Sequence, residues 1–188
     1  MSTTVLQLRR AEPDDPALLE RFRNGDPTAF DQLVVRHRRV VYLVARRLLR
    51  SHEEADEAAQ LAFIRAWKAR QQFRGDSALR TWLTRIVLNV AKTMRSNRVP
   101  VDGLDSAGAL EDPGDGADER VRREQLRARV RGAVAGLPDR QREVVTLKVF
   151  SEMTYREVAE VMGLSEGSIK AHLHQAVSNL RRLMASKD

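Results

Sequence analysis

Hydrophobic residues recur at every third or fourth position along most of the chain, which is the spacing of an amphipathic α-helix. Before residue 98 this spacing predicts four helices, over about 16–23, 28–50, 52–70 and 78–97. After residue 120 it predicts four more, over about 120–135, 139–150, 155–162 and 166–185. The few β-branched clusters lie inside these helical repeats. We therefore expect an all-α fold.

The last two predicted helices have clear end signals. Thr154 and Glu157 have the spacing of a capping box, and Gly163 stands where a left-handed residue ends a helix. Ser165 is placed to cap the next helix after a turn of about three residues. Helix, short glycine-containing turn and helix are the sequence form of a helix-turn-helix. Similar signals predict a capping box at Ser51 and a cap on the 78–97 helix from Asp76 or Ser77.

The strip 99–119 separates the two helical regions. It contains seven acids, no Lys or Arg, four glycines and two prolines, so it cannot bury enough apolar surface to offset its ordering entropy. We predict two small helical domains, 16–98 and 120–186, joined by a flexible acidic linker over 99–119. The net charges are +9 for 16–98, −7 for the strip and +6 from residue 120 to the end. The strip is either a plain solvated spacer or a segment that lies where a nucleic acid strand would otherwise run.

Composition narrows the class of protein. The net charge of +7 and a pI near 10.5 favour a polyanionic partner. The absence of cysteine excludes disulfides and cysteine zinc sites. The sequence shows no signal peptide and no run long enough to span a membrane, so we expect a cytoplasmic protein without membrane insertion. No group of residues has the spacing of a catalytic or metal site, so we expect neither enzymatic activity nor a cofactor.

The final predicted helix has two distinct faces. Ile169, Leu173, Ala176, Leu180 and Leu183 form an apolar face. The opposite side is small, polar and nearly free of acids, which suits contact with base edges in a major groove. Lys170 and Arg181 flank that side and can reach phosphates. A solvated outer face of a helix bundle is the alternative. A metal site at His172 and His174 is disfavoured because residues two apart point to different sides of a helix.

The helix over 78–97 and the loop before it have an unusual pattern. Its predicted core stripe contains Leu79, Leu83, Ile86, Val87, Val90 and Met94. Thr81, Arg85 and Lys92 form a basic polar face, with Trp82 and Asn89 at its boundary. The loop supplies Phe73, Arg74 and Gly75. An aromatic ring beside cations provides a stacking surface and counter-charge for single-stranded bases, although both aromatic residues can equally be core residues.

Three stretches carry a family resemblance. "EEADEAAQLAFIRAWKA" and "QQFRGDSALRTWLTRIVLNVAKTMR" resemble the polymerase-binding and promoter-melting segments of the extracytoplasmic-function (ECF) group of bacterial sigma factors. "LPDRQREVVTLKVFSEMTYREVAEVMGLSEGSIKAHLHQAVSNLRR" resembles their C-terminal helix-turn-helix domain. The resemblance covers about 18–97 and 121–183, in the order found in the family.

The resemblance implies a sigma factor that binds core RNA polymerase and directs promoter-specific initiation, with an anti-sigma factor as a further partner. It implies contact with the clamp helices of the largest polymerase subunit through Asp56, Glu57 and Gln60. Helix-dipole compensation by Glu53 and Glu54 is the other role for acids at this helix start, and both roles can hold together. The implied minus-ten contacts are Phe73, Arg74, Trp82, Arg85, Asn89 and Lys92. The implied minus-thirty-five contacts are Ser168, Lys170, Ala171, His172, His174, Gln175 and Arg181.

Two positions depart from the family pattern. Leu61 stands where an acid is usual, and His172 stands where Arg is more common. For His172 we expect minus-thirty-five contacts that are weaker, water-mediated or differently specific. One alternative function is a helix-turn-helix regulator, which requires a phosphoacceptor or ligand-binding α/β domain at the N-terminus. The other is a polymerase-binding decoy that never melts DNA.

Overall fold

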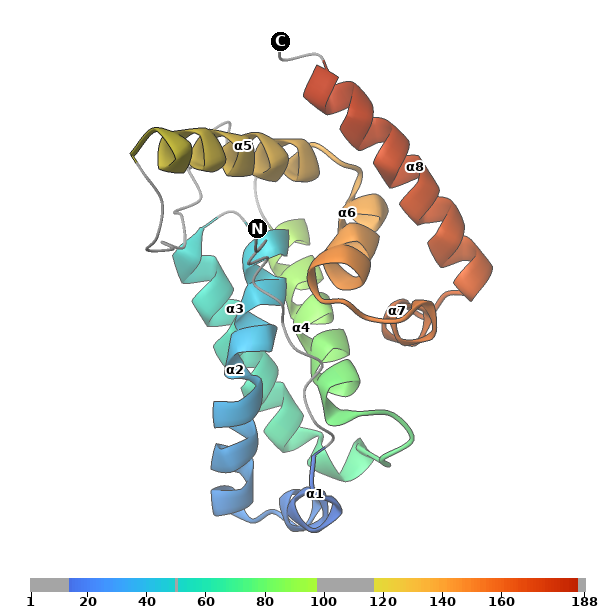
Figure 1. Cartoon of the computed structure of the whole chain (residues 1–188). Coiled ribbons are helices and arrows are strands. Elements are labelled where there is room, and N and C mark those ends of the chain that lie inside the picture. The colour runs from blue at the N-terminus through green and yellow to red at the C-terminus, as the bar shows by residue number, and fades with distance from the viewer. Residues whose placement is uncertain (1–13, 50, 98–116, 186–188) are drawn as a thin grey trace.

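The computed structural model describes residues 14–49, 51–97 and 117–185, and every regular element in these ranges is helical (Figure 1). The helices form an N-terminal and a C-terminal lobe. The predicted linker falls largely on residues 98–116, outside the described residues, and its last three positions belong to the first helix of the C-terminal lobe. No helix in the described ranges combines the length and apolar character needed to cross a membrane.

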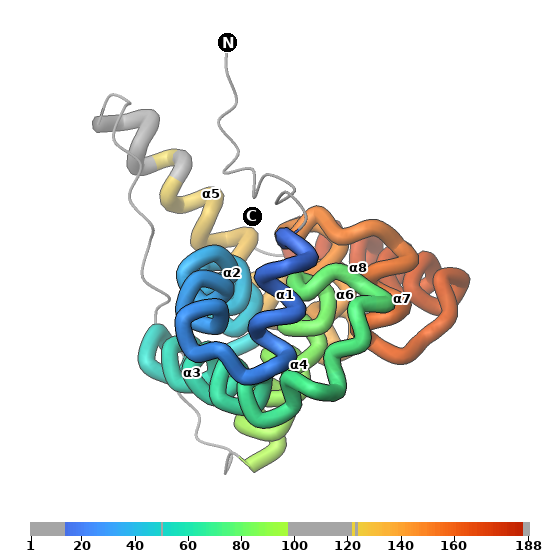
Figure 2. The backbone as a smooth tube through the Cα atoms, turned by 90° about the horizontal axis from the view of Figure 1, so that it is seen from below, coloured from blue at the N-terminus to red at the C-terminus, as the bar shows by residue number. Residues whose placement is uncertain are grey.

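The N-terminal lobe is a bundle of α2 (Pro27–Leu48), α3 (His52–Lys68) and α4 (Leu79–Ser96), with α1 (Pro16–Arg23) lying across one end (Figures 1 and 2). A short 3₁₀ turn, Arg70–Gln72, follows α3. Aromatic rings pack where α1 meets the bundle, with centroids 5.8 Å apart for Phe22 and Phe30 and 4.9 Å apart for Phe30 and Trp67. This cluster holds α1 on the bundle.

Side chains set most of the helix starts in this lobe. Asp26 Oδ1 accepts the N–H of Thr28 at 2.8 Å, and Ser51 forms a capping box with Glu54. The predicted cap on α4 is wrong. That helix begins after Ala78 without a side-chain cap.

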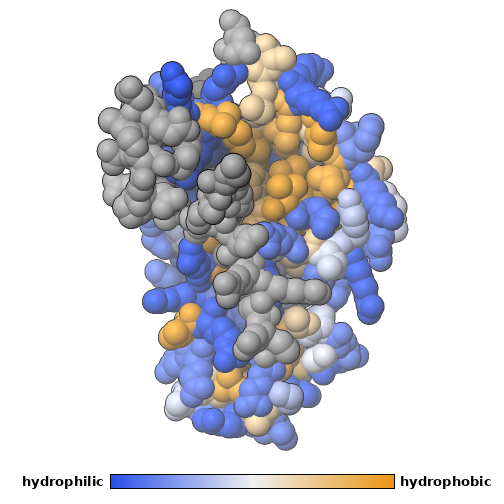
Figure 3. All heavy atoms as spheres, in the orientation of Figure 1, coloured by the Kyte–Doolittle hydropathy of each residue, from blue (hydrophilic) through white to orange (hydrophobic). Residues whose placement is uncertain are grey.

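The C-terminal lobe contains α5 (Ala117–Ala135), α6 (Asp139–Val145), α7 (Tyr155–Met162) and α8 (Glu166–Ala185). The predicted helix over 139–150 is interrupted: its second half, Thr146–Phe150, is a π-helical turn. Ser151 explains the wider turn, because its N–H and hydroxyl both donate to the Thr146 carbonyl, at 3.0 and 3.1 Å. On the face shown in Figure 3, hydrophobic side chains gather between α5 and α8, where a small apolar cluster around Leu137 and Ala176 lies.

The two lobes pack against each other through α4, which lies between α2 and α3 on one side and α7 on the other (Figure 2). One continuous apolar cluster joins Leu83 and Val87 of α4 to Leu147, Val158 and Met162 of the C-terminal lobe. The sequence pattern predicts two domains but does not predict this contact.

Candidate polymerase and nucleic-acid interfaces

The start of α3 presents an exposed polar row. The capping box fixes the first turn, with the Glu54 N–H donating to Ser51 Oγ at 3.1 Å. Asp56, Glu57 and Gln60 are all exposed, and Asp56 also pairs with His52 at 3.2 Å. The three predicted polymerase-binding residues therefore share one accessible surface.

An apolar residue that sequence reasoning missed extends this row. Ile64 lies one turn beyond Gln60 and is 50% exposed. Leu61, which stands where the family usually has an acid, is half-buried and packs on the main core. Ile64 gives the polar row an exposed apolar side chain that a protein partner can cover. The signal in the sequence is the spacing of four between Gln60 and Ile64.

The loop before α4 and the exposed side of α4 form a second candidate surface. Arg85 and Asn89 are exposed on successive turns, and Arg74 is exposed in the loop. Trp82 is half-buried at their edge. Lys92 follows one turn later but is only partly exposed, because its ammonium lies 3.3 Å from Glu143 of α6. The structure thus brings four of the predicted minus-ten residues, Trp82, Arg85, Asn89 and Lys92, to one side of α4.

Phe73 lies behind this surface. Its ring is 2% exposed and packs on Trp82 with a centroid separation of 5.3 Å. In this conformation the ring supports the tryptophan, and its own face is closed to a stacked base. Gly75 has a φ of +82°, a conformation that favours glycine, and the loop turns there.

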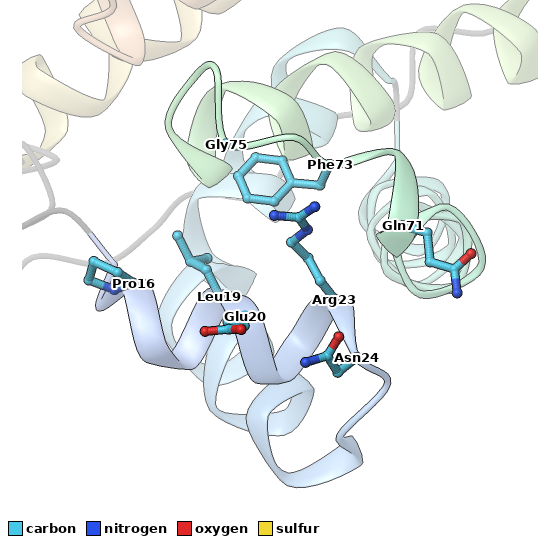
Figure 4. Close-up of a pocket in the computed structure, with 8 residues that line it drawn as sticks. All are labelled: Pro16, Leu19, Glu20, Arg23, Asn24, Gln71, Phe73 and Gly75. Atoms are coloured by element: carbon cyan, nitrogen blue, oxygen red, sulfur yellow. The ribbon is translucent and has the colours of Figure 1, made fainter.

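The loop borders an open hollow of about 740 Å³ between α1 and the 3₁₀ turn (Figure 4). Phe73 and Gly75 form its upper edge in that view, and the Arg23 side chain extends from α1 toward the phenyl ring. The lining residues are Pro16, Leu19, Glu20, Arg23, Asn24, Gln71, Phe73 and Gly75.

The helix-turn-helix is present with the predicted bounds. Thr154 forms the capping box of α7, and Gly163 ends that helix in the left-handed region at φ 66°. Ile169 and Ala176 are fully buried, which fixes the rotation of α8 about its axis. Lys170, Ala171, His174, Gln175 and Arg181 are exposed as predicted, whereas Ser168 and His172 are half-buried.

Ser168 has a structural partner. Its N–H donates to Ser165 Oγ at 3.1 Å, and the two hydroxyls lie 2.9 Å apart. Ser165 therefore caps α8 as predicted. The hydroxyl of Ser168 is engaged in that cap.

A cationic aromatic cluster beside α8 was missed by sequence reasoning. The ring of Tyr155 has the Lys148 ammonium 4.8 Å from its centroid and the Lys170 ammonium 5.5 Å from it. The two lysines come from different elements, so their spacing in the sequence carries no signal. They add positive charge next to the exposed face of α8.

Both lobes match known family models in this order, Sigma-70 region 2 over residues 33–99 and Sigma-70 region 4 over residues 127–180. The RNA polymerase sigma-H factor of Pseudomonas aeruginosa is 33% identical over 175 residues, which cover 88% of this chain and 91% of that protein. The ECF RNA polymerase sigma-E factor of Escherichia coli strain K12 is 34% identical over 173 residues, covering 86% and 90%.

Solved structures agree with these matches. The structure of CnrH in complex with the cytosolic domain of CnrY superimposes with a TM-score of 0.70 at 26% identity, over 92% of this chain and 97% of that chain. The sigma factor RpoE of Bartonella quintana, solved with the anti-sigma factor NepR, has the same fold, with a TM-score of 0.69 at 22% identity over 83% and 96%. The chain belongs to the ECF group of the sigma-70 family of bacterial RNA polymerase sigma factors.

Proposed function

We propose that this sigma factor binds core RNA polymerase through the exposed row on α3 and recognises a promoter at two separate elements. Asp56, Glu57 and Gln60 contact the clamp helices of the largest polymerase subunit, with Ile64 adding apolar contact. The exposed polar side chains at the positions implied by the family support this assignment. The chain acts by binding rather than by catalysis, in the cytoplasm, where polymerase works.

The exposed face of α8 reads the minus-thirty-five element as duplex. The observation that carries this assignment is the fixed rotation of α8: Ile169 and Ala176 are fully buried, so Ala171, His174 and Gln175 point outward. A helix of this kind fits the major groove with its side chains against base edges. Lys170 and Arg181 contact phosphates beside them.

The α4 surface binds the melted strand of the minus-ten element. Arg74, Arg85 and Lys92 supply counter-charge, and Trp82 with Asn89 forms the border where a base is held. Phe73 supports Trp82 and borders the hollow, so this ring acts on the strand through the loop. Because each lobe recognises a different promoter element, initiation requires both lobes.

Two of the solved structures that share this fold are complexes, one with the cytosolic domain of CnrY and one with the anti-sigma factor NepR. We infer that an anti-sigma factor also binds this chain. The regulator alternative fails on the fold, because the described N-terminal lobe contains helices and no strand of an α/β domain.

Run-off transcription tests the function directly. Purified chain and core polymerase are incubated with fragmented genomic DNA of the source bacterium, and the 5′ ends of the transcripts are sequenced. We expect a limited set of starts that share two upstream elements and that core polymerase alone does not produce. Core binding without any such starts would support the decoy instead.

A further inference from the structure

The C-terminal lobe covers one side of α4. Arg80 Nη2 donates to the Ser151 carbonyl at 2.6 Å, across the two lobes. The guanidinium of Arg47 on α2 lies 4.6 Å from the Phe150 ring centroid, and burial lowers the pKa of this arginine. Thr81 and Thr84 share this side of α4 by their spacing and are buried.

A buried carboxylate lies at the centre of this contact. The side chain of Glu143 is 3% exposed, with Oε2 3.3 Å from Lys92 Nζ and 3.5 Å from Arg140 Nη1. Oε1 lies 4.0 Å from Arg95 Nη1, and Arg95 also pairs with Asp139. Oε2 has no hydrogen bond of acceptable geometry, so surrounding positive charge is what offsets its burial.

Two of those cations come from α4. Lys92 belongs to the surface that we assign to the melted strand, and Arg95 lies on the next turn. A lysine ammonium held against a buried carboxylate cannot at the same time neutralise a DNA phosphate. The C-terminal lobe and the promoter strand therefore require the same group on α4.

We propose that this surface of α4 is shared: in the free factor Glu143 takes the place of DNA phosphates at Lys92 and Arg95, and separation of the lobes releases both cations for the melted strand. This inference rests on the proposed function of α4. It adds Arg95 to the DNA-binding residues and gives the C-terminal lobe an inhibitory role in the free factor.

The energetics allow such an exchange. Burying a carboxylate and its partner cations costs desolvation free energy that their attraction roughly offsets, so a buried ion pair contributes little net stability. Opening the lobes returns Glu143 to water and removes the need for its partners. The ion pairs of Glu143 therefore give the lobe contact its specific geometry but add little to the free energy needed to separate the lobes, which comes mainly from the apolar cluster.

The test uses the full chain with Glu143→Gln, which keeps the shape and removes the charge. Glu160→Gln is the matched control, because Glu160 is an exposed acid on α7. Binding to a labelled oligo-dT strand is titrated over a salt series without polymerase. We expect tighter binding by Glu143→Gln alone, with a slope of log affinity against log salt steeper by about 1.4, since two more phosphates are neutralised at about 0.7 each.

A cross-link between the lobes provides a second measurement, which remains valid if the Glu143→Gln variant does not fold. The chain has no cysteine, and Ser96 and Arg140 line the same small hollow between α4 and α6. A Ser96→Cys, Arg140→Cys variant is either joined by a short bis-maleimide or capped with N-ethylmaleimide. We expect the joined form to bind oligo-dT more weakly than the capped form.

Equal binding by wild type and Glu143→Gln at every salt concentration, with equal binding by the joined and capped forms, would overturn the shared surface. Run-off transcription with core polymerase distinguishes a failure of the shared-surface proposal from a failure of the proposed sigma-factor function. If wild type and Glu143→Gln both direct specific starts, the sigma-factor function stands. If neither does, the function itself is wrong.

Discussion

Asp14 and His37 form a buried pair, with Asp14 Oδ2 3.0 Å from His37 Nε2 and both side chains at most 5% exposed. Arg36 Nη1 donates to the same carboxylate at 2.9 Å. The contact fastens the residue two positions before α1 to the middle of α2. It therefore sets where α1 enters the bundle, and α1 forms one wall of the hollow beside the loop of Phe73.

This pair predicts a loss of stability in acid. Burial alone would raise the pKa of Asp14, but the hydrogen bonds and charges of His37 and Arg36 outweigh it and lower the pKa below its ordinary 3.8. The lowered pKa of the Asp14 carboxyl therefore contributes its stability in full above about pH 3.8, and this contribution is lost as the pH falls through the lowered pKa. Asp14→Asn should cost about 1–3 kcal/mol of unfolding free energy at neutral pH.

Urea denaturation of wild type and Asp14→Asn at pH 6 and pH 3 measures this effect. The difference between the two proteins should shrink at the lower pH. Asp31→Asn on the exposed side of α2 is the control and should match wild type at both values. A difference that stays constant between the two pH values would show that the Asp14 carboxyl does not cause the loss of stability in acid.

Local sequence signals predict the helix-turn-helix well. The capping box at Thr154, the left-handed Gly163 and the bounds of α8 are confirmed. Each depends on residues within one or two turns of one another, so the sequence contains the whole signal. The sequence did not predict the π-helical turn. That turn depends on the side chain and N–H of Ser151 both donating to the Thr146 carbonyl, which the helical spacing does not indicate.

The burial of residues along α4 was predicted less well from the sequence. Thr81 was expected on an exposed basic face with Arg85 and Lys92, and this expectation is wrong, since Thr81 is 2% exposed. Leu88 lies outside the predicted core stripe and is fully buried. A single stripe assumes one covered face, whereas the C-terminal lobe covers a second face of this helix. The α7 residues that cover this second face are more than 50 positions away from α4 in the sequence, so local spacing cannot indicate them.

The exposed row on α3 predicts the polymerase contact. A Glu57→Lys, Gln60→Ala variant should weaken binding to core polymerase by about tenfold or more, which is about 1.4 kcal/mol. Both side chains are exposed, so the helix should keep its stability. Titrated pull-down with purified core polymerase measures the affinity, and circular dichroism checks the fold. Ile64→Ala should add to the loss, whereas Glu160→Lys in the other lobe should leave core affinity unchanged.

Asn89 gives the cleanest test of the minus-ten surface, because Phe73→Ala would also empty part of the core. Asn89→Ala should leave closed-complex binding nearly intact and reduce opening, as measured by permanganate reactivity on a promoter found by the run-off experiment. Each hydrogen bond from the Asn89 amide to a base is worth about 0.5–1.5 kcal/mol. Asn97→Ala at the end of the same helix is the control. An equal defect on duplex and pre-melted templates would argue against a role in melting.

The exposed face of α8 predicts two separable effects on duplex binding. His174→Ala removes a side chain aimed at base edges, so it should reduce the preference for the cognate minus-thirty-five element over a mismatched one by about 1–3 kcal/mol. Lys170→Gln removes a phosphate contact instead. It should weaken binding to both duplexes alike and make the salt slope shallower by about 1.

Fluorescence anisotropy with holoenzyme on both duplexes, over a salt series, separates these outcomes. Lys148→Gln should behave like Lys170→Gln, because both ammonium groups lie over the ring of Tyr155. Arg156→Gln, an exposed cation at the start of α7, shows how much any nearby charge contributes. If His174→Ala weakens both duplexes equally, the histidine contacts the backbone, and the bases must be read by Ala171 and Gln175 on the same face.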